Sequence, residues 1–415
     1  MRKVDVAIIG AGHAGLNALK EVRRAGCSWV LIDGGPLGTT CARVGCMPSK
    51  AVIELAQHFA PERHAPDKGQ CADVSALLER VRDLRDTFVD LVLANSTDNM
   101  VEGQELLRGQ ARFIEPDLLE VNGEPIRASR IIVATGSRCV VPEKWRELGD
   151  RLLTSDSLFD LEHLPGSVAV VGLGAIGLEL GQALSRLGVE VTHGNTGVQV
   201  RAGSQEIVAE RLLAAVGRVP NIPEGLSELC ETDDRGVPIF DPKTLQVGDL
   251  PIFIAGDATG DRMMLQDAAE EGRVAGANAT RETPFPFVRK LPMAIVFSDP
   301  NIAQVGARLD QIPDAVVGHQ RFGPVGRALI MGRNRGLIRL YAQRGSGRLL
   351  GASMVGPRVE HLAHLVAWSV QQGHTVQEMQ KMPFYHPVIE EALQDALRDT
   401  AQRVAMAGSP EIEAA

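Results

Sequence analysis

The chain has 415 residues and a mass of 44.5 kDa, enough for two or three domains. Its 52 acidic residues outnumber its 43 basic residues, and the net charge of −9 argues against a nucleic-acid-binding protein. No apolar run is long enough to span a membrane, and glycines interrupt the apolar run near the N-terminus, which argues against a signal peptide. Six cysteines are too few for a secreted disulfide scaffold, so the sequence predicts a cytoplasmic protein that does not bind membranes.

A glycine pattern occurs twice, each time after a β-type apolar run and before a helical pattern. In such a turn, the first glycine permits the tight bend, the second lets the backbone approach a pyrophosphate, and the third lets the helix pack on the strand. Two copies in this context favour two dinucleotide sites over glycines in ordinary loops. The six glycines are Gly10, Gly12 and Gly15 in the first copy, and Gly172, Gly174 and Gly177 in the second.

The segments after the two glycine patterns differ. After the first, a strand over residues 28–32 is expected to end at Asp33, where a carboxylate can accept hydrogen bonds from a ribose. After the second, the strand expected over residues 189–192 ends without an acid, and a short hairpin and a buried strand come next. Because Gly172 and Gly217 are only 45 positions apart, we expect a shortened second unit. The alternative is that a stretch is missing from the sequence near His193 and Gly194.

Two cysteines, Cys41 and Cys46, lie close together shortly after the first unit's acid. Residues five apart in an ideal helix rise about 7.5 Å, more than the roughly 4.4–6.8 Å between the Cα atoms of a disulfide. A bridge therefore requires a distorted turn, which the flexible Gly45 and the missing N–H of Pro48 favour. The two cysteines are either unrelated buried thiols or a redox-active pair.

The glycine patterns together with Cys-x4-Cys-x-Pro-Ser-Lys resemble the flavin-dependent pyridine nucleotide–disulfide oxidoreductases. The resemblance extends over nearly the whole chain and is closest to the dihydrolipoamide dehydrogenases. It implies that Cys41 and Cys46 form a redox disulfide, that FAD and NAD are the cofactors, and that no metal is required. In this family a dithiol passes electrons through the disulfide and FAD to NAD.

The resemblance also implies cofactor contacts at particular positions. Lys50 would lie beside the flavin and pair with Glu179, and Asp257 would hold the ribityl chain of FAD. Gly217 falls on the strand that closes the nicotinamide-binding unit. The other implied contacts to FAD are Ala111, Thr135, Gly136, Ser137, Met263, Met264, Leu265 and Gln266.

Near the C-terminus, His386 is followed five positions later by Glu391. The resemblance implies that these residues are the active-site base and its orienting acid, and that they reach the dithiol from the partner subunit of a homodimer. A histidine suits this task because its pKa lies near the operating pH.

The expected fold is α/β, with two Rossmann-like dinucleotide-binding domains, the second shortened, and a C-terminal α+β dimerisation domain. We expect FAD-binding parts at residues 1–146 and 241–285, an NAD-binding domain at 147–240 and the dimerisation domain at 286–415. The expected partners are a second copy of the chain and a small dithiol or disulfide, or a lipoyl-bearing protein. Two alternatives remain: a redox-sensing or structural dimer with a defective nicotinamide half, and a reductase of another disulfide.

Overall fold

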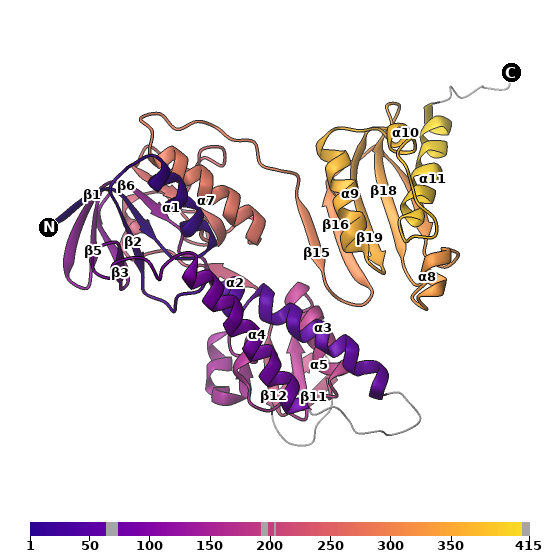
Figure 1. Ribbon diagram of the computed structural model, residues 1–415, viewed down its shortest axis with the longest axis horizontal. Helices are drawn as coiled ribbons and strands as arrows, with labels where there is room; N and C mark the ends of the chain where they lie inside the picture. The colour runs from indigo at the N-terminus through magenta and orange to yellow at the C-terminus, as the bar shows by residue number, and fades with distance from the viewer. Residues whose placement is uncertain (64–73, 192–197, 203–204, 409–415) are drawn as a thin grey trace. The chain divides into compact units, whose positions relative to one another are not determined.

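The computed structural model describes residues 1–63, 74–191, 198–202 and 205–408 (Figure 1). The chain divides into two compact units, Met1–Val288 and Arg289–Ala415. Within the described residues, no helix has the length and apolar character needed to cross a membrane.

The first unit contains a seven-stranded sheet. Its strands are β1 (Arg2–Ile9), β2 (Trp29–Asp33), β3 (Leu106–Arg108), β4 (Ala111–Glu115), β5 (Leu118–Val121), β6 (Glu124–Val133) and β14 (Ile252–Ile254). The order is β3-β2-β1-β6-β5-β4, and β14 also pairs with β6. The pairs among β3, β2, β1, β6 and β14 are parallel, whereas β4, β5 and β6 pair antiparallel. The last four residues of β1 are all buried, as expected for a parallel strand covered on both faces.

Two helices, α1 (His13–Arg24) and α7 (Leu265–Ala279), pack tightly against each other in this unit. A Cβ added at Gly272 would lie only 2.2 Å from the carbonyl oxygen of Ala14, so the glycine is required for this close approach. The resemblance also implies that residues 263–266 open a helix, and α7 begins there: Met264 is its N-cap, and Leu265 and Gln266 lie in its first turn.

Between β2 and β3 the structure describes three helices. The helices are α2 (Thr40–Arg43), α3 (Cys46–Arg63) and α4 (Val74–Ala94). The break between α2 and α3 separates the two cysteines of the predicted redox pair.

A smaller parallel sheet comes next in the chain, in the order β8-β12-β9. It consists of β8 (Leu152–Leu153), β9 (Val168–Val171) and β12 (Arg211–Ala214), with α5 (Ala175–Arg186) directly after the second glycine turn. The predicted hairpin is confirmed as β10 (Val198–Ala202) and β11 (Gln205–Ala209). The strand predicted over 189–192 does not form: Glu190 makes one isolated bridge to Ser167, and residue 192 lies outside the described residues.

The remaining elements of the first unit are short. They are the antiparallel pair β7 (Ser137–Cys139) and β13 (Arg218–Pro220), the helix α6 (Leu226–Leu229), and the 3-10 helices at Glu143–Arg151, Leu158–Asp160 and Gly256–Thr259.

The second unit is an antiparallel sheet with helices packed on it (Figure 1). The strand order is β15-β16-β19-β18-β17, and α9 contacts β16 and β19 while α11 contacts β17 and β18. Its strands are β15 (Met293–Val296), β16 (Asn301–Gly306), β17 (Ala315–Arg321), β18 (Leu337–Gln343) and β19 (Leu349–Gly356). Its helices are α8 (Gly326–Ile330), α9 (Val359–Gln371), α10 (Val376–Met379) and α11 (Glu391–Gly408), with a 3-10 turn at Leu309–Gln311.

Candidate active site

The first glycine turn leaves an open space for a dinucleotide. Gly10 has φ +110°, and a Cβ there would lie 2.2 Å from the carbonyl oxygen of Ala134. A Cβ at Gly15 would lie 1.9 Å from the carbonyl oxygen of Gly10, so both positions exclude a side chain. A Cβ at Gly12 would meet no atom within 4 Å, so the backbone is accessible there. These residues therefore fit the pyrophosphate of FAD, which binds at the N-terminus of a helix such as α1.

Asp33 lies at the end of β2 beside this turn. One carboxylate oxygen accepts a hydrogen bond from the Ala11 N–H at 2.6 Å, and the other accepts one from the Gly35 N–H at 2.7 Å. These bonds hold the carboxylate next to the glycine turn, where the ribose of a bound dinucleotide lies. Ala111 is the first residue of β4 and is buried.

The second glycine turn has the same local geometry as the first. A Cβ at Gly172 would lie 2.2 Å from the Ala215 oxygen, and one at Gly177 would lie 1.9 Å from the Gly172 oxygen. Gly174, like Gly12, would meet nothing within 4 Å. The segments beside the two turns differ, because within the described residues the outer edge of β9 is bonded by the backbone of Glu190 alone. The turn is complete, whereas the described part of the neighbouring strand is a single bridge.

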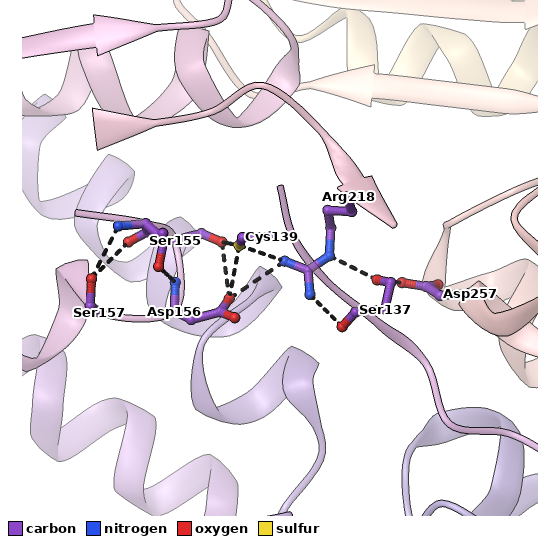
Figure 2. Close-up of polar contacts among 8 residues, drawn as sticks. Ser137, Cys139, Ser155, Asp156, Ser157, Arg218 and Asp257 are labelled. Carbon is purple, nitrogen blue, oxygen red and sulfur yellow. Dashed lines mark hydrogen bonds and ion pairs between the residues drawn. The ribbon is translucent and has the colours of Figure 1, made fainter. Parts of the chain in front are cut away.

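A polar network connects the two dinucleotide units (Figure 2). The Ser137 hydroxyl donates to Asp257 at 2.6 Å and accepts from Arg218 Nε at 2.8 Å. Arg218 also donates to the Ser137 carbonyl at 2.8 Å and lies 3.4 Å from a carboxylate oxygen of Asp156. Ser137 and Asp257, predicted separately as FAD contacts, are therefore bonded directly to each other, and Arg218 of β13 holds Ser137 in place.

Arg218 is a residue that the sequence prediction missed. It directly follows Gly217, whose φ of +114° turns the chain from β12 into β13. Next to it, the Thr135 hydroxyl donates to the Asn221 carbonyl, and the Asn221 N–H donates to the Gly136 carbonyl at 2.9 Å. Thr135, Gly136 and Gly217 thus belong to the same connection. Its position directly after Gly217, on the strand that the resemblance implies, was the only signal in the sequence.

Cys41 and Cys46 lie on either side of the break between α2 and α3. A Cβ at Gly45 would lie 2.9 Å from the Thr40 oxygen and 3.1 Å from the Cys41 Cα, so this glycine lets the two cysteines approach. Both residues are free thiols in this structure. The distorted turn that the sequence predicted is confirmed.

The two thiols have opposite electrostatic environments. Cys41 donates a hydrogen bond to Cys46, which raises the pKa of Cys41 well above its usual range. The same hydrogen bond and the Lys50 ammonium lower the pKa of Cys46 to about 6, although burial opposes this shift. Lys50 Nζ lies 2.7 Å from a carboxylate oxygen of Glu179, so α3 and α5 are joined by an ion pair. The surroundings of Cys46 therefore favour its thiolate form over that of Cys41.

Alkylation of the reduced protein is expected to follow this difference. The rate of iodoacetamide modification at Cys46, measured by peptide mass spectrometry, should rise with a midpoint near pH 6, because the thiolate is the nucleophile. Lys50→Met should move the midpoint upward. Cys230 is the control, since burial raises its pKa. A midpoint for Cys46 at the ordinary thiol value would contradict the prediction.

The second unit contains the predicted base and its acid. His386 Nδ1 lies 2.8 Å from Glu391 Oε1, and the other carboxylate oxygen accepts from the Val388 N–H at 3.2 Å. The hydrogen bond with His386 lowers the pKa of Glu391, so the carboxylate is ionised and can only accept. Nδ1 therefore carries the proton, and Nε2 is available as a base. The two cysteines belong to the compact unit Met1–Val288, whereas His386 and Glu391 belong to the compact unit Arg289–Ala415.

The comparisons with known proteins agree with these features. A family model described as pyridine nucleotide-disulphide oxidoreductase matches residues 4–198, and the dimerisation-domain model of the same family matches residues 293–397. Dihydrolipoyl dehydrogenase 3 of Haloarcula marismortui is 26% identical, with 96% of this chain and 97% of the relative aligned. The dihydrolipoyl dehydrogenase of Thermus scotoductus is 29% identical, with 95% and 97% aligned.

Among solved structures, the flavoprotein disulfide reductase RclA from Escherichia coli has the same fold. It superposes with a TM-score of 0.81 at 22% identity, over 95% of this chain and 99% of that chain. The alignment with the Haloarcula relative spans 468 positions, more than the 415 residues of this chain, so the relative contains residues that this chain lacks.

Enzymes of this kind use FAD and NAD(H), and the dimerisation domain points to a homodimer. The glycine turns, the paired thiols and the two matched domains together show that this chain belongs to the pyridine nucleotide-disulphide oxidoreductase family.

Proposed function

We propose that the protein is a dihydrolipoamide dehydrogenase-like enzyme that oxidises a small dithiol and passes the electrons through FAD to NAD. The observation that carries the proposal is the close approach of Cys41 in α2 and Cys46 at the start of α3 across Gly45, where their hydrogen bond raises the pKa of Cys41 and lowers that of Cys46. Such a polarised pair is typical of a redox disulfide.

In the proposed reaction, the Cys41–Cys46 pair starts as a disulfide. A substrate thiolate attacks the Cys41 sulfur, and the Cys46 thiolate, which has the lower pKa, leaves. The second substrate sulfur then attacks the mixed disulfide and releases Cys41. The substrate becomes a disulfide and the protein a dithiol, so two electrons enter the pair. His386 accepts a substrate thiol proton at Nε2, while Glu391 fixes the ring.

The residues for FAD are those of the first glycine turn together with Asp33, Ala111, Thr135, Ser137, Asp257 and the start of α7. Bound FAD would supply the two-electron acceptor that links the dithiol to the nicotinamide. Lys50 and Glu179 place a cation from α3 and an anion from α5 next to Cys46. Their role is to set the charge around the sulfur.

The proposed assembly is a homodimer in which His386 of each subunit serves the cysteine pair of the other, as the family resemblance implies. The partner is a small dithiol or a lipoyl-bearing protein, and the compartment is the cytoplasm.

The decisive experiment is reductive titration of the FAD-loaded protein. The wild type should absorb at about 450 nm as a flavoprotein, and dihydrolipoamide should bleach this absorption. Dithionite should deliver about four electrons per subunit, two to the disulfide and two to the flavin. Cys46→Ser should lower the count to about two, because the disulfide can no longer form.

Cys230→Ser is the matched control, because Cys230 contacts the Leu226 carbonyl and has no place in the proposed site. It should keep the four-electron count. An unchanged count in Cys46→Ser, or a protein that cannot be loaded with FAD, would contradict the proposed function.

A second candidate function is a redox-sensing dimer that receives electrons from thiols but reacts poorly with NADH. In the part of the chain that the structure describes, the outer edge of β9 is paired at Glu190 alone, which favours this candidate. The nicotinamide experiment in the Discussion separates the two.

A further inference from the structure

A cavity of about 370 Å³ opens on the second unit beside His386. Residues 387–390, which join His386 to Glu391, form part of its wall. The other lining residues are Arg327 in α8, Met331 directly after α8, Arg358 at the N-cap of α9 and His361 in the first turn of α9. A cavity of this volume lies in the range of small-molecule sites. It can hold one end of a small molecule whose other end lies at His386.

The charges around this cavity favour an anion. Arg327 and Arg358 line it, and neither forms an ion pair with any carboxylate that the structure describes. His361 lies 3.6 Å from Glu360, so its charge is already matched when it is protonated. Glu390 supplies the negative charge of the described lining. Two guanidinium groups against one carboxylate leave a net positive site, and the guanidinium fork matches the geometry of an oxyanion.

The backbone at Arg358 adds a second argument. This residue is the N-cap of α9 and has φ 54° and ψ 27°, a left-handed conformation that glycine adopts more easily. An arginine kept in this conformation points to a role for its side chain. The 13-residue helix α9 also directs the positive end of its dipole toward residues of the lining.

We propose that this cavity binds the carboxylate of a small acidic dithiol or disulfide through Arg327 and Arg358, while the substrate sulfurs react beside His386. The proposal rests on the proposed function and narrows its substrate class. A free acid such as lipoate is preferred over a neutral amide of the same chain length, which is the form attached to a lipoyl-bearing protein.

Binding of oxidised lipoate and oxidised lipoamide to the FAD-loaded dimer, measured by isothermal titration calorimetry, tests this proposal without turnover. The two probes differ only in the charge at one end. The wild type should bind lipoate roughly three- to tenfold more tightly than lipoamide. This is the effect expected of a charged hydrogen bond that is weakened by exposure to solvent. Arg327→Gln and Arg358→Gln should each reduce this preference, whereas Glu390→Gln should increase it. Added salt should weaken lipoate binding more than lipoamide binding.

Arg344→Gln is the matched control, because Arg344 is an exposed arginine of the same unit that does not line the cavity. It should keep the wild-type preference. Equal affinities for the two probes in the wild type, no binding of lipoate, or a preference that survives both arginine substitutions would overturn the proposal. Failure of dihydrolipoamide to reduce the flavin, with the lipoate preference intact, would instead overturn the proposed function and leave the cavity assignment standing.

Discussion

His386→Gln is expected to slow oxidation of dihydrolipoamide by about 10²–10⁴-fold, the usual contribution of a general base. The glutamine keeps a polar side chain of similar length, but its amide cannot act as a base at neutral pH. Glu391→Gln should cause a smaller loss, because the carboxylate orients His386 through a 2.8 Å contact and does not itself take the substrate proton. The measurement is kcat with dihydrolipoamide, after matched FAD content and melting temperature have been verified.

Tyr385→Phe is the control for this experiment, because Tyr385 adjoins His386 in the chain and is 80% exposed. It should retain the wild-type rate. A rate for His386→Gln within a few-fold of the wild type would remove His386 from the catalytic step.

His386→Gln also tests the proposed dimer. Mixtures of His386→Gln and Cys41→Ser subunits should regain activity, because a hybrid dimer contains one intact combination of cysteine pair and base. Lack of complementation after verified subunit exchange would place both groups of one site in a single chain.

NADH is expected to reduce the flavin slowly and only at high concentration, while dithionite reduces it normally. The second glycine turn is complete, but residues 192–200 contain no aspartate or glutamate in the place that Asp33, the proposed ribose contact, has after the first turn. Losing one charged hydrogen bond costs about 1.5–3 kcal/mol, or roughly ten- to a hundredfold in affinity. The measurement is stopped-flow reduction over a range of NADH concentrations.

Gly174→Ala provides the test of the turn itself. Its Cβ would meet no protein atom within 4 Å, so the fold should be kept, while the approach of a pyrophosphate is blocked. NADH reduction should therefore become weaker still. Fast reduction by micromolar NADH, in a protein whose intact mass is 44.5 kDa, would show that the missing acid is unimportant.

The glycine turns were predictable because their backbone geometry depends on residues that are close in sequence. A strand, three glycines at fixed spacing and a helix are sufficient, and the turns at Gly10 and Gly172 have almost the same contacts. The break between Cys41 and Cys46 was predictable for the same reason, since Gly45 and Pro48 act locally.

The remaining features depend on contacts between distant segments. The strand expected at 189–192 has an apolar pattern, but a strand forms only where a neighbour pairs along its length, and among the described residues 189–191 only Glu190 pairs. Arg218 contacts Ser137, which is 81 positions away, and no local pattern indicates that contact. The cavity beside His386 likewise combines residues from α8, α9 and the loop before α11.

Arg218 also limits how far this chain could be shortened in the course of evolution. It follows β12 of the three-stranded sheet, yet its guanidinium holds Ser137 and, through Ser137, also Asp257, which lies shortly after the strand β14 of the seven-stranded sheet. Deleting β12 or β13 would remove that support, whereas deleting the segment between α5 and β10 would leave it in place. A lineage that lost the segment between α5 and β10 would therefore retain β12 and β13, independently of any selection for nicotinamide binding.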